Sequence, residues 1–153
     1  MQYWLMKSEP EAFSIDDLMH AKEMTTTWDG VRNYQARNFM KQMKLGDLVF
    51  FYHSNCKVPG IIGIAKVCRE AYPDFTAQDP QDIHYDPKST PEKPIWEMVN
   101  VQFVKKFKEV LPLQQLYQHP ELQEMPLIRK GNRLSVMPVT DNQWNFILQH
   151  VST

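Results

Sequence analysis

The stretch from Thr25 to Asn38 holds the densest set of side chains in this sequence that could take part in chemistry. Trp28 precedes Asp29-Gly30, a turn dipeptide, so we expect its indole to lie on a loop and to line a pocket instead of filling the core, offering a flat apolar face and one N–H donor. Amides, guanidiniums and a hydroxyl follow on Asn33, Tyr34, Arg37 and Asn38. Amides and guanidiniums suit base edges, and aromatic rings suit base faces. The stretch therefore indicates a nucleobase site, although a core tryptophan beside a solvated polar helix would give the same pattern.

Three further groups of polar side chains stand on predicted strands. Pro10 ends the first strand and leaves a cation, a hydroxyl and a carboxylate on its rigid end, in Lys7, Ser8 and Glu9. A second strand ends in Tyr52, His53 and Ser54, with one face of that strand expected in the core. Ser135 is a candidate polar contact on a later strand. Plain strand termini would look the same.

Catalytic and metal-binding motifs are missing from the sequence. We find no GxGxxG, Walker, HExxH, GxSxG or CxxC pattern, and the five histidines have no metal-ligand spacing. We therefore expect no catalytic residue, no metal and no cofactor. Two alternatives stay open: a small nucleobase-processing hydrolase with Glu9 or His53 as general base, and an adaptor that binds a peptide or metabolite.

The charge balance excludes a protein that wraps duplex DNA by electrostatics alone. Lys and Arg number 17 against 18 Asp and Glu, for a net charge of −1, with small basic clusters only near residues 105–108 and 129–133. The N-terminus does not resemble a signal peptide, and no apolar run is long enough for a membrane span. We expect a soluble, cytoplasmic monomer without membrane contact.

Hydrophobic periodicity predicts an α+β domain over residues 1–153. We expect strands at residues 2–7, 48–54, 61–69, 96–107 and 134–139, a helix capped by Ser14, a helix over residues 31–43, helical turns near 113–117 and 121–125, and a C-terminal helix capped by Thr140. Between them, the acidic segment 72–95 carries five prolines, which exclude a regular helix or a central strand. Such a pattern favours a curved, mostly antiparallel, barrel-like sheet.

In several motifs, spread over nearly its whole length, the chain resembles the EVE domain family. They are YWLMKSEP at 3–10, WDGVRNYQARN at 28–38, GD at 46–47 with FYHS at 51–54, AYPD at 71–74, and LSV at 134–136 with PV at 138–139. The resemblance is to a bacterial stand-alone member. It implies a PUA-like fold, a curved β-barrel of five or six strands flanked by short helices, and kinship with YTH domains.

The resemblance also implies a function and a place for the candidate residues. EVE domains are proposed readers of modified bases, chiefly methyl- and hydroxymethylcytosine in DNA, with RNA also considered, held on a single strand or after base flipping. Lys7, Ser8 and Glu9 would lie at the pocket rim and Trp28 would stack on the base. The helix residues Asn33, Tyr34, Arg37 and Asn38 would line or brace the pocket, and Tyr52, His53 and Ser54 would close its other wall.

Overall fold

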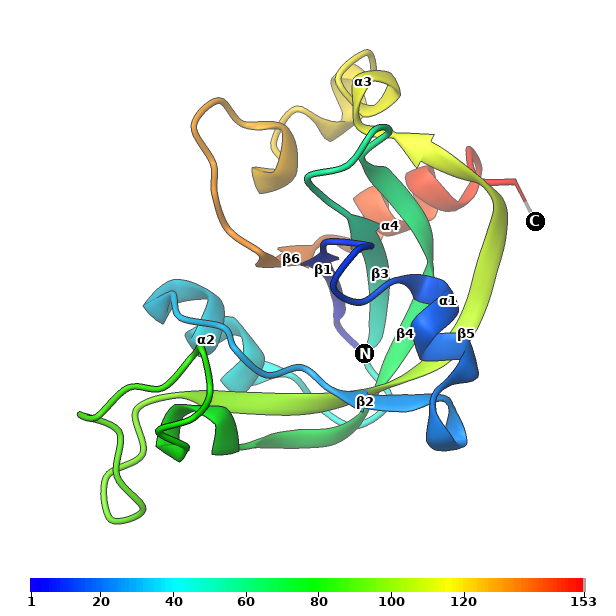
Figure 1. The fold of residues 1–153 in the computed structure, drawn as a ribbon. Helices are drawn as coiled ribbons and strands as arrows, with labels where there is room; N and C mark the ends of the chain where they lie inside the picture. The colour runs from blue at the N-terminus through cyan, green and yellow to red at the C-terminus, as the bar shows by residue number, and fades with distance from the viewer. Residues whose placement is uncertain (153) are drawn as a thin grey trace.

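The computed structural model describes residues 1–152, in which six strands form one sheet in the order β2-β5-β4-β3-β1-β6 (Figure 1). The strands are β1 (Tyr3–Ser8), β2 (Thr25–Thr27), β3 (Leu48–His53), β4 (Gly60–Pro73), β5 (Glu97–Pro112) and β6 (Val136–Val139). The α-helices are α1 (Ile15–His20), α2 (Tyr34–Gln42), α3 (Leu113–Leu116) and α4 (Asp141–Leu148). Single 3-10 turns are η1 (Lys22–Met24), η2 (Phe75–Gln78), η3 (Pro120–Leu122) and η4 (Pro126–Ile128).

The predicted α+β class and the curved, mostly antiparallel sheet are confirmed. Only β1 and β3 pair in parallel among the described strands, and the register of β4 against β5 shifts at four places. Such bulges bend a strand and increase its twist, and Figure 1 shows β5 sweeping around the molecule. The sheet does not close into a full barrel, because β2 and β6 form its two edges.

Strand β3 is buried on both faces, so the expected core face is present and the opposite face is covered as well. Phe50 stacks on Trp144 of α4, with ring centroids 3.8 Å apart. On the opposite face, Phe51 meets the Trp28 ring edge-on at 5.5 Å. A central strand between two other strands takes apolar side chains on both sides when both faces are covered. The Trp28 loop is therefore the cover of one face of the sheet.

Local hydrogen bonds define where the helices begin. Ser14 and Thr140 each form the predicted capping box, with Asp17 and Gln143 respectively. The helix predicted from residue 31 instead begins at Tyr34, because the Asn33 side chain accepts from the Ala36 N–H and caps it. Residues 28–33 thus form an irregular, unwound segment, which allows them to border a cavity.

Other boundaries also shift. Strands β4 and β5 run four and five residues beyond their predicted ends, because each supplies the other's hydrogen-bond partners. The short β2 was not predicted, since three threonines show no alternation; it forms by pairing with β5.

None of the helices in residues 1–152 is long and apolar enough to cross a membrane.

Candidate functional site

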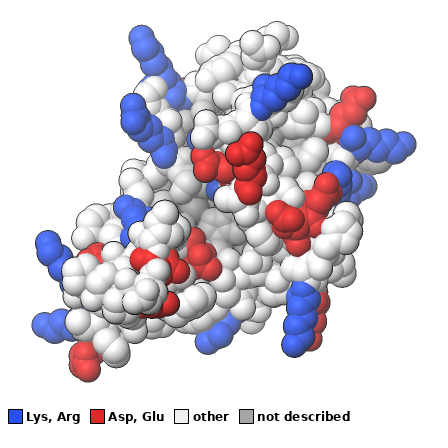
Figure 2. All heavy atoms as spheres, viewed as in Figure 1, with Lys and Arg blue, Asp and Glu red and all other residues white. Residues whose placement is uncertain are grey.

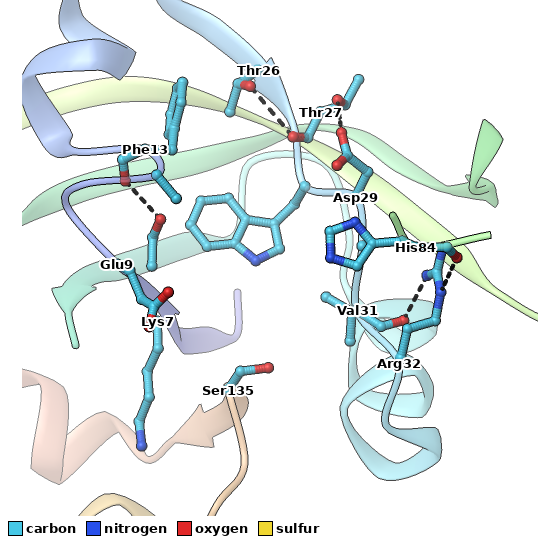
Figure 3. A pocket seen from close by; sticks show the side chains of 14 residues that line it. Lys7, Glu9, Phe13, Thr26, Thr27, Asp29, Val31, Arg32, His84 and Ser135 are labelled. Atoms are coloured by element: carbon cyan, nitrogen blue, oxygen red, sulfur yellow. Dashed lines mark hydrogen bonds between the residues drawn. The ribbon is translucent and has the colours of Figure 1, made fainter. Parts of the chain in front are cut away.

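A cavity of about 570 Å³ lies where the end of β1, the segment after β2 and two distant residues meet (Figure 3). In Figure 3, Lys7, Glu9 and Phe13 form one wall, Asp29, Val31, Arg32 and His84 face them, and Ser135 lies across the opening between the two. The full lining is Lys7, Ser8, Glu9, Ala12, Phe13, Thr26, Thr27, Trp28, Asp29, Gly30, Val31, Arg32, His84 and Ser135. Both apolar and hydrogen-bonding side chains therefore face this space.

Trp28 belongs to the core and to the cavity at once. Its side chain is 8% exposed and packs against Phe51, while part of it borders the cavity. Its backbone N–H donates to the Val99 carbonyl at 2.7 Å, which continues the pairing of β2 with β5 for one more residue. The indole is thus held rigidly from behind. Such an aromatic ring can accept a flat partner without further loss of side-chain freedom.

The wall from Lys7 to Phe13 is fixed by its own hydrogen bonds. The Ser8 hydroxyl donates to the Phe13 carbonyl at 2.6 Å, and the Glu9 carbonyl accepts from the Ala12 and Phe13 N–H groups. The Lys7 N–H donates to the Ser135 carbonyl at 2.8 Å, which joins β1 to the segment before β6. Burial lowers the pKa of the Lys7 ammonium. This wall contributes one cation, held beside the cavity by backbone bonds.

Asp29 presents a carboxylate whose orientation is set by its neighbour. The Thr27 hydroxyl donates to Asp29 Oδ2 at 2.6 Å. The other carboxylate oxygen has no hydrogen-bond partner among residues 1–152. Asp29 is half-buried and lines the cavity. It can therefore accept a hydrogen bond from an amino group placed there.

The segment 29–32 is anchored by the fully buried carboxylate of Asp74. Asp74 accepts from the Gly30 N–H at 2.8 Å and from Arg32 Nη1 at 3.0 Å, and its other oxygen accepts from the Thr76 N–H and hydroxyl. Burial alone raises the pKa of Asp74, but the bonds from Thr76, Gly30 and Arg32 outweigh it and hold the pKa below its ordinary value. The charged form of Asp74 therefore stabilises this wall.

His84 brings the acidic segment 72–95 to the cavity. Gly30 has φ +79°, and a Cβ there would lie 2.9 Å from the His84 ring, so both space and backbone conformation favour glycine. Arg32 Nε donates to the His84 carbonyl at 2.9 Å. Arg32 Nη1 donates to the Val31 carbonyl and to the Asp74 carboxylate, and Nη2 donates to the Thr76 hydroxyl. The Arg32 guanidinium therefore links segment 29–32 to segment 72–95.

Five of the twelve candidate residues line this cavity: Lys7, Ser8, Glu9, Trp28 and Ser135. The other seven lie elsewhere: Asn33, Tyr34, Arg37, Asn38, Tyr52, His53 and Ser54. Asn33 is occupied as the cap of α2. Ser54 donates its N–H to the Ser8 carbonyl and supports the wall from behind. Direct contact of these seven with a ligand stays a prediction.

The helix residues form a separate stack outside the cavity. The Tyr34 ring lies on Trp96 with centroids 4.8 Å apart and is 59% exposed. The Arg37 guanidinium lies over Tyr34, donates to the Ile95 carbonyl and pairs with the Asn38 side chain. These contacts tie α2 to the end of segment 72–95. Tyr34, Arg37 and Asn38 therefore do not line the cavity.

Tyr52 and His53 lie behind the cavity wall. Tyr52 is 2% exposed, and burial, with smaller contributions from Tyr117 and Cys56, raises its pKa to about 12. Burial lowers the pKa of His53, and its Nε2 accepts from the Ile15 N–H at 3.1 Å. An imidazole that accepts from the backbone has that nitrogen occupied. His53 therefore supports the start of α1.

Several cavity residues were missed in the sequence. Asp29, Val31 and Arg32 stand beside Trp28 in the same motif, so closeness in sequence could have found them. Ala12 and Phe13 follow the Lys7–Pro10 group, and Thr26 and Thr27 precede Trp28. His84 lies more than fifty residues from any of these, and no local pattern signals its approach.

Charge is distributed unevenly around the hollowed centre of the molecule. Figure 2 shows Asp and Glu to the right of the hollow and below it to the left, and Lys and Arg along its upper left edge. Over residues 1–152, no group of three or more His, Cys, Asp and Glu side chains is arranged to hold a metal ion. The cavity lining itself carries both signs of charge, on Lys7 and Arg32 and on Glu9 and Asp29.

Comparison with known proteins assigns the family. The EVE domain model matches residues 2–150. The chain is 48% identical to mouse thymocyte nuclear protein 1 over 163 aligned residues, which cover 95% of this chain and 72% of the mouse protein. A crystal structure of a Pseudomonas syringae protein matches with a TM-score of 0.93 at 54% identity, covering 97% of this chain and 98% of that one. Since animal and bacterial proteins both match, a bacterial origin stays a prediction.

One similar structure contains nucleic acid. The human THYN1 protein, solved in complex with DNA containing 5-methylcytosine, matches with a TM-score of 0.94 at 46% identity, covering 98% of this chain and 97% of that one. The DUF55 domain of human thymocyte nuclear protein 1 also matches, with a TM-score of 0.92. These similarities agree with the PUA-like fold implied by the sequence motifs. The chain belongs to the EVE domain family.

Proposed function

We propose that this protein binds nucleic acid by enclosing a modified cytosine, 5-methylcytosine or 5-hydroxymethylcytosine, in the cavity beside Trp28. The observation that carries the proposal is the cavity itself: an indole, a free carboxylate oxygen and apolar side chains border one space of about 570 Å³. The human relative solved with 5-methylcytosine DNA supports the choice of ligand.

Stacking supplies part of the binding free energy in this proposal. A base on an aromatic side chain gains about 1–3 kcal/mol. Removing a base from a duplex costs a few kcal/mol and is cheapest for single strands and disturbed pairs. Trp28 is braced by Phe51 and by its bond to Val99 before any ligand arrives, so little ordering cost opposes stacking. We therefore expect tighter binding to single strands than to intact duplex.

The edge of the base would be read by Asp29. Cytosine carries an N4 amino donor, and a carboxylate is its natural acceptor among side chains. Asp29 has one oxygen held by Thr27 and the other without a partner among the described residues. Glu9 also lines the cavity, but it is exposed and accepts from the Asn55 side chain at 2.6 Å. Asp29 is the better-oriented acceptor.

The C5 substituent would meet the apolar part of the lining. Ala12, Phe13 and Val31 border the cavity with Trp28. Burying one methyl group contributes about 0.8 kcal/mol, or roughly fourfold in affinity. That is enough to prefer methylcytosine over cytosine. A hydroxymethyl group additionally needs a polar partner, which the hydroxyl of Ser135 can provide.

Paired oligonucleotides test the proposal. Single strands that differ only at one central base (cytosine, 5-methylcytosine or 5-hydroxymethylcytosine, as DNA and as RNA) would be titrated against the wild type and Asp29→Asn. We expect the wild type to prefer a modified base. We expect Asp29→Asn to lose about tenfold for modified cytosine, since a specific base contact contributes about 1–3 kcal/mol. Glu92→Gln, an exposed charge outside the cavity, is the matched control.

Equal binding of every oligonucleotide by the wild type would contradict the proposal. The hydrolase alternative has less support for His53, because the nitrogen that a histidine base needs already accepts from the Ile15 N–H. Glu9, which has one oxygen bonded to Asn55, is the base that this alternative retains. Mass analysis of the bases after incubation separates the two. A product that disappears in Glu9→Gln or His53→Ala would make the protein an enzyme.

A further inference from the structure

A second, polar groove adjoins the cavity. It encloses about 430 Å³ and is lined by Asn33, Gln35, Pro126, Arg129, Gly131, Asn132, Arg133 and Leu134. Two chain segments border both spaces. In the first segment, residues 30–32 line the cavity and residues 33 and 35 line the groove. In the second segment, residues 131–134 line the groove and residue 135 lines the cavity. The cavity and the groove therefore adjoin each other along these two segments.

The side-chain amides of the groove keep their donors free. Asn33 Oδ1 accepts from the Ala36 N–H, and Asn132 Oδ1 accepts from the Leu134 N–H, both at 2.9 Å. Each amide oxygen is thus used within the chain, and each NH2 group has no partner among the described residues. An amide whose oxygen is occupied acts as a donor only.

The charge of the groove is also one-sided. Arg133 is exposed and forms no ion pair within residues 1–152. Arg129 pairs with Glu124, but both side chains are more than half exposed, and such pairs are weak. No Asp or Glu is among the described residues that line the groove, whereas Glu9 and Asp29 line the cavity. Donors without acceptors match an anion with several oxygens.

The other approaches to the cavity are acidic. Segment 72–95 supplies His84 with Asp82 3.4 Å from its ring, and Glu9 stands at the opposite rim. A phosphate backbone would be repelled there. Figure 2 places the basic side chains along the upper left edge of the hollow, where Figure 1 shows the chain between η4 and β6 facing α2.

We infer that the polar groove holds the phosphates that flank the enclosed base. The strand enters over α2 and the segment 129–134, with Arg133 contacting a phosphate and the amides of Asn33 and Asn132 donating to its oxygens. This inference rests on the proposed function, since it places the backbone relative to the base. Phosphate contacts fix register without reading sequence, so the groove contributes affinity and the cavity contributes selectivity.

A charge-removal pair tests the inference. Arg133→Gln would be compared with Lys105→Gln, which removes one exposed charge on β5 that lines neither space. The probes are a single-stranded DNA with one central 5-methylcytosine and the same strand with cytosine, each at several salt concentrations. We expect Arg133→Gln to weaken both strands equally, by about fivefold, and to lower the log–log salt slope by about 0.7. Arg133→Lys should retain the slope, because an ammonium still contacts a phosphate.

The outcomes separate the groove from the cavity. If Arg133→Gln matches Lys105→Gln in affinity and slope while the wild type prefers the methylated strand, the groove is not the phosphate site and the proposed function stands. If Arg133→Gln weakens only the methylated strand, Arg133 reads the base and the inference is overturned. If the wild type shows no preference for the methylated strand, the proposed function fails, and the inference fails with it.

Discussion

Trp28 belongs to the hydrophobic core and also lines the cavity, two roles that different residues usually have. It covers one face of β3 through Phe51, and it borders the cavity. A ring that is only 8% exposed owes its position to the core, so the surface it offers to a ligand is fixed by packing. Any change at this position therefore alters folding and binding together, and a conservative substitution is needed to tell them apart.

Trp28→Phe should fold with a small loss and bind several-fold more weakly. Phenylalanine keeps an aromatic face but presents a smaller area for stacking. Trp28→Ala should lower the free energy of unfolding by about 3–5 kcal/mol, the usual cost of removing a large buried ring. Urea unfolding and titration with methylated single strands measure the two effects. A Trp28→Phe protein that binds as tightly as the wild type would show that the indole does not contact the base.

At the scale of elements, the decisive contact is between two irregular segments. Beyond Pro73, where β4 ends, segment 72–95 has no further strand and only one 3-10 turn, yet Asp74, Thr76, Ala77 and Ser89 are buried in it. Asp86 further accepts from the Trp96 indole N–H at 2.7 Å. Hydrogen bonds of buried polar groups hold the segment in place, where a strand would have backbone hydrogen bonds to its neighbours. Through Asp74 the segment also fixes the position of segment 29–32. A long proline-rich loop thus acts as the outer support of the cavity.

Asp74→Asn should destabilise the protein by about 3 kcal/mol at neutral pH. The substitution leaves Arg32 without its counter-charge and sets an amide NH2 against other donors. Because the folded-state pKa of Asp74 is lowered, its contribution is present above the ordinary carboxyl pKa and is lost as the pH falls through the folded-state value. The difference between wild type and variant should therefore shrink as the pH falls below the ordinary carboxyl pKa.

Urea unfolding at several pH values, with Asp79→Asn as an exposed control in the same segment, checks this. A difference that is the same at neutral and acid pH would mean that packing, and not charge, accounts for the loss. Weaker binding by Asp74→Asn is also expected, since Gly30 and Arg32 would lose their anchor.

At the scale of the whole molecule, near neutrality limits how strongly this protein can hold a phosphate backbone. The net charge is −1, and the basic residues that line the cavity, Lys7 and Arg32, are matched there by the acidic residues Glu9 and Asp29. Under the proposed function, affinity must therefore come mainly from the enclosed base. The proposed phosphate contacts in the polar groove would then be few, which is the arrangement of a module that selects a base more than it binds the backbone of a strand.

The salt dependence of binding should accordingly be shallow. With about two to four phosphate contacts, the log–log slope on single strands should lie near −1.5 to −3.5, and the preference for a modified base should survive moderate salt. Titrations of paired strands over a range of salt concentrations measure both quantities. A slope steeper than about −5 without preference for a modified base would identify a plain electrostatic binder.

Features that depend on neighbours in sequence were predicted well. The caps at Ser14 and Thr140 are bonds to the residue three positions on, and the β3–β4 hairpin follows from two apolar runs around a Pro-Gly turn. Trp28 borders a cavity, as the turn beside it suggested, and the end of β1 reaches the same space. These outcomes depend on local hydrogen bonds and on the alternation of apolar residues, and both can be recognised within a few consecutive residues.

The composition of the site was decided only by the tertiary structure. Helix α2 begins at Tyr34 and not at residue 31, Tyr34 stacks on Trp96, and the irregular residues Asp29 and Val31 line the cavity. His84 and Ser135 arrive from distant positions. Asp74 reaches Gly30 across 44 residues because a buried carboxylate must find donors wherever the fold supplies them. Such pairings satisfy groups that burial has removed from water, and burial is a property of the whole fold.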